Sequence, residues 1–147
     1  MKKFSLYLLA VLIASTGFIY RVKHEGAISP AKQALLAHTW RMETVFQHKS
    51  TNTQIIYRRG APASEEDLSA VRLTCKSNGT IQYVDENGAR GNNARYQLTD
   101  NDKKIRISYA GLNITGENVV VNGNQFAYTV KYNNTDSSRF VYSPIWL

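Results

Sequence analysis

Apolar and polar side chains alternate along most of the chain after residue 38, which is the pattern of β-strands with one buried face. The segments 71–75, 105–109 and 126–132 each place an apolar residue at every second position. Turn sequences separate these runs, and the Asn-Gly pairs at 78–79 and 122–123 are strong hairpin signals. The pattern predicts eight or nine short strands joined by short turns.

The predicted turns are mostly two to five residues long, which leaves no room for the helices that connect parallel strands. The sheet is therefore expected to be antiparallel, with neighbouring strands following one another along the chain. A sheet of this length curls or closes, because an open one leaves two exposed edges. We expect an all-β fold over residues 38–143, an up-and-down meander that forms a barrel or a curved half-barrel.

One short helix is expected before the first strand. Ser29 suits the N-cap position and Pro30 suits the first helical position, and residues 31–37 follow with helix-forming side chains. Leu35 and Leu36 are available to pack against the sheet. We expect this helix to cap one end of the barrel against Trp40.

The chain begins with Met1-Lys2-Lys3, followed by an uncharged and mainly apolar segment from residue 4 to residue 20. This is typical of an export signal, although the segment is long for a signal peptide and short for a spanning helix. Residues 1–28 are thus interpreted as a signal peptide or an N-terminal membrane anchor with a spacer, and 29–147 as the exported domain. The basic start and the lack of paired cysteines favour the periplasm or outer envelope of a bacterium. Membrane contact is expected through this segment if it is not cleaved.

The net charge of +7 overstates the basic character of the domain, because part of it lies in residues 1–28. Four basic residues and one acid lie in residues 1–28, and the remaining 14 basic and 10 acidic residues leave +4 on the domain. The basic residues of the domain are mostly single and alternate along predicted strands. Nucleic-acid binders concentrate lysine and arginine on one face, so no nucleic-acid partner is expected. A protein partner is left open.

No catalytic or metal-binding arrangement is recognisable. His24, His38 and His48 are far apart, and a structural zinc site needs about four closely spaced ligands. The chain has no nucleophile elbow and no phosphate-binding loop. Cys75 lies in an alternating run and is expected to be a small buried side chain. We therefore expect no enzyme activity, no metal and no cofactor.

The layout of a short helix, a first strand opening on Trp40, a hairpin meander and a late arginine resembles the lipocalin-like proteins, especially small exported ones of bacteria. That family opens the first strand with Gly-x-Trp, whereas this chain has His38 in place of the glycine. The resemblance extends over about residues 30–143. It implies a barrel whose closed end is formed by Trp40 and by Arg139 packing over it.

The interior of such a barrel is either filled by side chains or holds one small ligand. Tyrosines at inward positions suit an apolar pocket with a few polar contacts. Phe46 is expected on the same face as Trp40 and near the open rim, with Tyr109 and Tyr132. The expected ligand-binding residues are Phe46, Tyr83, Tyr96, Tyr109, Tyr128 and Tyr132.

A hollow barrel and a filled barrel predict two different functions. The first is a non-catalytic envelope protein that binds a small hydrophobic or amphipathic molecule in the barrel. The alternative is a structural or protein-interaction domain with a filled core. A cavity of roughly 300 Å³ or more favours the first, because ligand pockets start at about that size.

Overall fold

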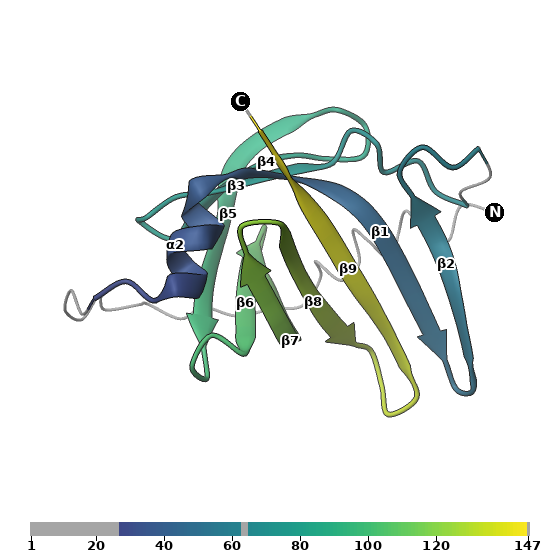
Figure 1. The fold of residues 1–147 in the computed structure, drawn as a ribbon. Coiled ribbons are helices and arrows are strands. Elements are labelled where there is room, and N and C mark those ends of the chain that lie inside the picture. The colour runs from purple at the N-terminus through teal and green to yellow at the C-terminus, as the bar shows by residue number, and fades with distance from the viewer. Residues whose placement is uncertain (1–26, 63–64, 147) are drawn as a thin grey trace.

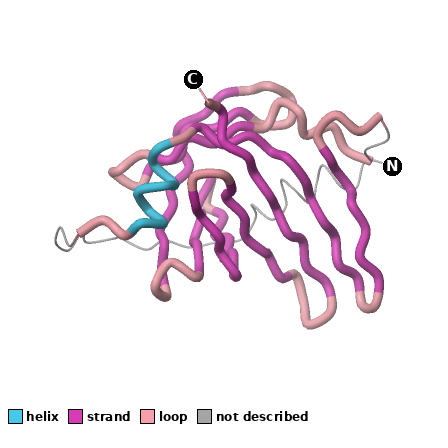
Figure 2. Tube along the Cα trace, viewed as in Figure 1, coloured by secondary structure: helices cyan, strands magenta, loops and turns pink. Residues whose placement is uncertain are grey.

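The computed structural model describes residues 27–62 and 65–146 of the 147. Within them lie one helix and nine strands, shown in Figures 1 and 2. The elements are α2 (Pro30–Ala37), β1 (Thr39–Lys49), β2 (Asn52–Arg58), β3 (Arg72–Cys75), β4 (Thr80–Val84), β5 (Arg90–Thr99), β6 (Lys104–Tyr109), β7 (Leu112–Asn122), β8 (Gln125–Lys131) and β9 (Asp136–Ile145).

All strand pairs are antiparallel, and the strand order is β2-β1-β3-β4-β5-β6-β7-β8-β9 with a further pairing of β1 with β9. The β1–β9 pairing closes an eight-stranded barrel. The predicted all-β meander barrel with a short N-terminal helix is confirmed.

Strand β1 pairs with three other strands, which is why the sheet has nine strands although the barrel has eight. Its first residues, 39–41, pair with β3, and its later residues, 44–49, pair with β2 along the same edge. Its other edge pairs with β9 along the whole length. Strand β2 is therefore an addition to the barrel and contributes nothing to its closure (Figure 1).

Helix α2 lies against one end of the barrel, as predicted. The Ser29 side chain accepts a hydrogen bond from the Lys32 backbone N–H at 3.2 Å, so Ser29 is the N-cap. The Trp40 indole Nε1–H donates to the Leu35 carbonyl at 3.0 Å. Leu35 and Trp40 are both fully buried, so helix and barrel share one core.

A β-bulge in β1 changes which side chains face the barrel interior. Met42 pairs with Tyr142 of β9, but the next pair along β1 is Thr44 with Val141, so β1 holds one extra residue. The inward alternation of Trp40 and Met42 therefore continues through Val45 rather than through Thr44. The prediction that Phe46 shares a face with Trp40 is wrong for this reason.

The core at the helix end consists of aromatic rings in contact. Trp40 meets Phe126 edge-on with ring centroids 5.9 Å apart, and Phe126 stacks on Tyr142 at 5.3 Å. Tyr128 continues the group through a 5.4 Å contact with Phe140. Trp40 and Phe126 fill the end of the barrel beneath α2, and the other rings continue the cluster along β8 and β9.

The segment interpreted as a signal peptide or anchor, residues 1–28, lies outside the described residues except for its last two. In the part of the chain that the structure describes, no helix has the length and apolar character needed to cross a membrane.

Candidate functional site

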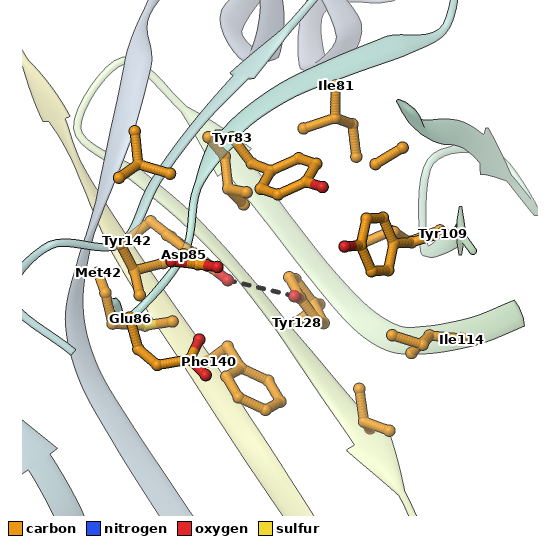
Figure 3. Close-up of a pocket in the computed structure, with 16 residues that line it drawn as sticks. Met42, Ile81, Tyr83, Asp85, Glu86, Tyr109, Ile114, Tyr128, Phe140 and Tyr142 are labelled. Atoms are coloured by element: carbon orange, nitrogen blue, oxygen red, sulfur yellow. Dashed lines mark hydrogen bonds between the residues drawn. The ribbon is translucent and has the colours of Figure 1, made fainter. Parts of the chain in front are cut away.

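A cavity of about 160 Å³ lies inside the barrel. All eight barrel strands contribute to its wall, and most of the wall is apolar. Figure 3 shows the side chains arranged around this common space. The lining residues are Met42, Val71, Leu73, Ile81, Tyr83, Val84, Asp85, Glu86, Ala94, Ile107, Tyr109, Ile114, Tyr128, Val130, Phe140 and Tyr142.

Two tyrosine hydroxyls form a polar spot in the cavity wall. The oxygen atoms of Tyr128 and Tyr142 are 3.3 Å apart, within hydrogen-bonding distance, and both side chains are buried (Figure 3). A hydroxyl pair has two hydrogens and uses one of them in the bond between its members. The other hydrogen is available for an acceptor atom in the cavity.

Both phenols are neutral at physiological pH. Burial raises the pKa of Tyr128 to about 12, although the hydrogen bond to Tyr142 opposes this. Burial also raises the pKa of Tyr142 well above its ordinary value, and the neighbouring Tyr128 adds to the effect. The hydroxyl pair is therefore a neutral hydrogen-bonding group in the cavity wall.

A second tyrosine pair forms another part of the wall. The rings of Tyr83 and Tyr109 meet edge-on with centroids 5.2 Å apart. The Tyr83 hydroxyl donates to Asn93 Oδ1 at 2.8 Å. The Tyr83 ring lies directly over Gly91, its partner on β5, and a side chain at Gly91 would collide with that ring. The lack of a side chain there is what allows Tyr83 to lie along the wall.

Two acidic residues from the β4–β5 turn, Asp85 and Glu86, complete the lining. Asp85 Oδ1 accepts hydrogen bonds from the backbone N–H groups of Asn87 at 2.9 Å and Ala89 at 2.8 Å, which fixes the turn. No lysine or arginine is among the described residues that line the cavity. The electrostatic environment therefore disfavours a ligand that carries a carboxylate.

Six residues were predicted to bind a ligand. Three of them lie together in the cavity wall, namely Tyr83, Tyr109 and Tyr128. Tyr96 is buried elsewhere in the core, where its hydroxyl donates to the Lys76 carbonyl at 2.9 Å. Tyr132 lies just beyond the end of β8, is 39 % exposed and does not line the cavity.

Phe46 and Arg139 are also placed away from the interior. They are register partners on the outer faces of β1 and β9. One Arg139 guanidinium nitrogen donates to Thr129 Oγ1 at 3.2 Å and to the Asn118 carbonyl at 3.4 Å. Trp40 instead pairs with Pro144, and its indole nitrogen is satisfied by the helix. Trp40 is therefore buried beneath α2, and Arg139 does not pack over it.

Tyr142, which supplies one hydroxyl of the pair, was not among the predicted binding residues. Its signal was present, because Ser138, Phe140 and Tyr142 occupy alternate positions of the last strand, and all three are buried. Asp85 and Glu86 were not predicted to line the cavity, because a turn sequence does not indicate the direction in which its side chains point.

The described residues hold neither a metal-binding cluster nor a cysteine that is ionised at physiological pH. Among the described residues, no group of three or more histidine, cysteine or carboxylate side chains is placed to hold a metal ion. Cys75 is 3 % exposed, and burial raises the pKa of its thiol to about 12, so it is not a thiolate at physiological pH.

Comparison with known proteins places the chain in no family. No protein-family description, curated protein or solved structure gives a significant match. The closed antiparallel barrel is consistent with a lipocalin-like fold on geometry alone.

Proposed function

We propose that this chain is a non-catalytic, lipocalin-like protein of the bacterial cell envelope that binds one small apolar molecule inside its barrel. The observation that supports the proposal is the apolar cavity of about 160 Å³ with a tyrosine hydroxyl pair in its wall. Protein interiors are close-packed, and voids larger than a water molecule are few. The volume is below the roughly 300 Å³ expected of a pocket for a drug-sized molecule, so the proposal is confined to a smaller ligand.

The volume narrows the class of ligand. It lies below the roughly 300 Å³ at which pockets for drug-sized molecules begin, so a long acyl chain does not fit. An apolar cavity of about 150 Å³ in another protein binds benzene. The ligand is therefore expected to be a single ring or a short hydrocarbon chain.

The polar groups of the cavity wall restrict the chemical class of the ligand further. The spare hydrogen of the Tyr128–Tyr142 pair suits a hydroxyl or carbonyl oxygen on the ligand. Asp85 and Glu86 repel a carboxylate. Together these groups favour a neutral hydroxylated ring, such as an alkylphenol, over a fatty acid.

The alternative is a protein-interaction domain that needs no ligand, and the modest volume of the cavity favours it. Titrating the purified protein with 4-ethylphenol, ethylbenzene and octanoate separates the two functions. We expect 4-ethylphenol to bind most tightly and to raise the melting temperature, because a ligand that binds the folded state stabilises it. Dissociation constants that are all weaker than about 1 mM, with no change in melting temperature, would favour the interaction domain.

Two variants locate the binding site. Ala94→Leu adds a side chain that fills part of the cavity and is expected to abolish binding, whereas Ala89→Leu makes the same change at an exposed turn position and should not. Tyr142→Phe is expected to weaken 4-ethylphenol by about three- to tenfold, the usual contribution of one hydrogen bond, and to leave ethylbenzene unchanged.

The envelope location is a separate prediction. The basic start and apolar segment of residues 1–20 are expected to carry the domain across the inner membrane. Alkaline phosphatase fused after Leu147 should be active, since that enzyme requires an oxidising compartment. A β-galactosidase fusion at the same position that is fully active in the cytoplasm would contradict this location.

A further inference from the structure

The strand register aligns arginines that are far apart in the sequence. Arg41 of β1 is the direct partner of Arg72 of β3. Arg72 pairs in turn with Val84 of β4, and Val84 pairs with Arg90 of β5. Directly opposite residues of an antiparallel pair project from the same face. Arg41, Arg72 and Arg90 therefore form one row across the outer face of the barrel.

A second row runs beside the first, two residues further along the strands. Thr39 pairs with Thr74, and their hydroxyl oxygens are 2.8 Å apart. Thr74 pairs with Gln82, and the bulge between β4 and β5 brings Asn92 next in line. This row supplies hydroxyl and amide groups, which both donate and accept hydrogen bonds.

The two rows border a groove of about 540 Å³ on the outer face of β3, β4 and β5. Arg72 and Arg90 line it together with Thr39, Thr74, Gln82 and Asn92. No described acidic residue lines the groove. With adjacent strands about 4.8 Å apart, the Arg72 and Arg90 backbones are separated by about 10 Å.

Placing these arginines together costs stability. Like charges directly opposite each other in a sheet are destabilising. Burial, and the neighbouring guanidinium groups of Arg59 and Arg41, lower the pKa of Arg72. One acid relieves part of the charge, since Glu43 lies 3.7 Å from Arg59 and accepts a hydrogen bond from Ser143, which itself accepts one from Arg41. None of the described carboxylates lines the groove that holds Arg72 and Arg90.

We propose that this groove binds a sugar chain that carries carboxylate groups, with Arg72 and Arg90 each holding one carboxylate. Guanidinium groups bind carboxylates through two parallel hydrogen bonds. In Arg72 these two bonds come from Nε and Nη2, because Nη1 donates to the carbonyls of Ser69 at 2.6 Å and Val71 at 2.9 Å. The spacing of about 10 Å between the two arginine backbones suits carboxylates on separate sugar units. The threonine and amide row then meets the sugar hydroxyls. The site is on the outside of the barrel, and it shares Tyr83 and Val84 with the lining of the interior cavity.

The composition of the groove favours a sugar over a nucleic acid. Single-stranded nucleic acids bind largely by stacking their bases on aromatic rings. Tyr83 is the only aromatic residue among the described groove residues, and its ring is held against Gly91 and Tyr109. The rings needed for stacking are therefore missing from the groove.

The test measures binding of an oligogalacturonate to the full chain by calorimetry at physiological ionic strength. A neutral malto-oligosaccharide of equal length, a polyphosphate and a single-stranded oligonucleotide serve as comparison probes. We expect the oligogalacturonate to bind and the neutral sugar not to bind. The double variant R72Q/R90Q is expected to weaken binding by about tenfold or more for each guanidinium removed, because hydrogen bonds to charged groups are the strong ones.

The matched control is R95Q/R106Q, which removes two arginines from exposed positions on the outer faces of β5 and β6, outside the groove. It should change the affinity by less than about twofold, because exposed charges that do not touch the ligand are largely screened. An equal loss in the control variant, or no binding of the oligogalacturonate, overturns the site. Tighter binding of the polyphosphate or oligonucleotide, with the same dependence on Arg72 and Arg90, overturns the assignment of a carboxylated sugar.

Discussion

Replacing Trp40 with alanine is expected to lower the free energy of unfolding by about 3–5 kcal/mol, the usual cost of emptying a buried aromatic site. Trp40 has no exposed surface and packs against Phe126 at the closed end of the barrel. Its indole N–H also satisfies the Leu35 carbonyl of α2. The substitution removes both contacts, and urea denaturation followed by circular dichroism measures the loss.

Two further variants separate the parts of this effect. Trp40→Phe keeps a ring but loses the N–H, so it should cost less than Trp40→Ala while still freeing the helix end. Trp146→Ala is the control, since Trp146 is 68 % exposed. A loss of under about 1 kcal/mol for Trp40→Ala is incompatible with a buried aromatic side chain at this position.

The folded domain is expected to lose stability steeply between about pH 10 and pH 12, because unfolded tyrosines ionise near pH 10. Burial raises the pKa of Tyr96 and of Tyr128 to about 12. In this window the unfolded chain has released these phenolic protons and the folded protein still holds them, so a rise in pH favours unfolding. Below about pH 10 both states are protonated and the full stability is present.

Each such tyrosine is expected to contribute a loss of about 1.4 kcal/mol per pH unit within the window. Tyr142, whose pKa is raised well above its ordinary value, adds to the slope. Two or three groups therefore remove several kcal/mol, a large share of the 5–15 kcal/mol typical of a domain. Urea midpoints measured from pH 8 to pH 12 test this, with Tyr96→Phe expected to reduce the slope. Equal stability at pH 8 and pH 12 would show that these hydroxyls are not buried.

The fold was predictable because its signals are local. Alternation identified the strands, short turns made the sheet antiparallel, and Ser29-Pro30 located the start of the helix. The place of Trp40 at the closed end was implied by the lipocalin-like resemblance, and the structure buries Trp40 beneath that helix. None of these inferences required knowledge of which residues are register partners.

The errors arose where register decides the outcome. The β1 bulge adds one residue at Glu43, and a shift of one residue moves every later side chain to the opposite face. Phe46 was assigned to the interior because no feature of the sequence indicates that bulge. For the same reason the basic residues looked scattered, although Arg41, Arg72 and Arg90 lie in one row once the strands are paired.

Strand β2 gives the molecule one exposed sheet edge, which a simple closed barrel does not have. A closed barrel has no sheet edge, yet β2 ends the strand order and pairs only with β1. Part of its outer edge is covered, because the Ile56 carbonyl accepts a hydrogen bond from the Glu65 N–H at 3.2 Å. Exposed edges are where other chains add strands. Self-association by strand addition, if it is provoked by destabilising the protein, therefore has its starting point at residues 52–55, on one side of the molecule.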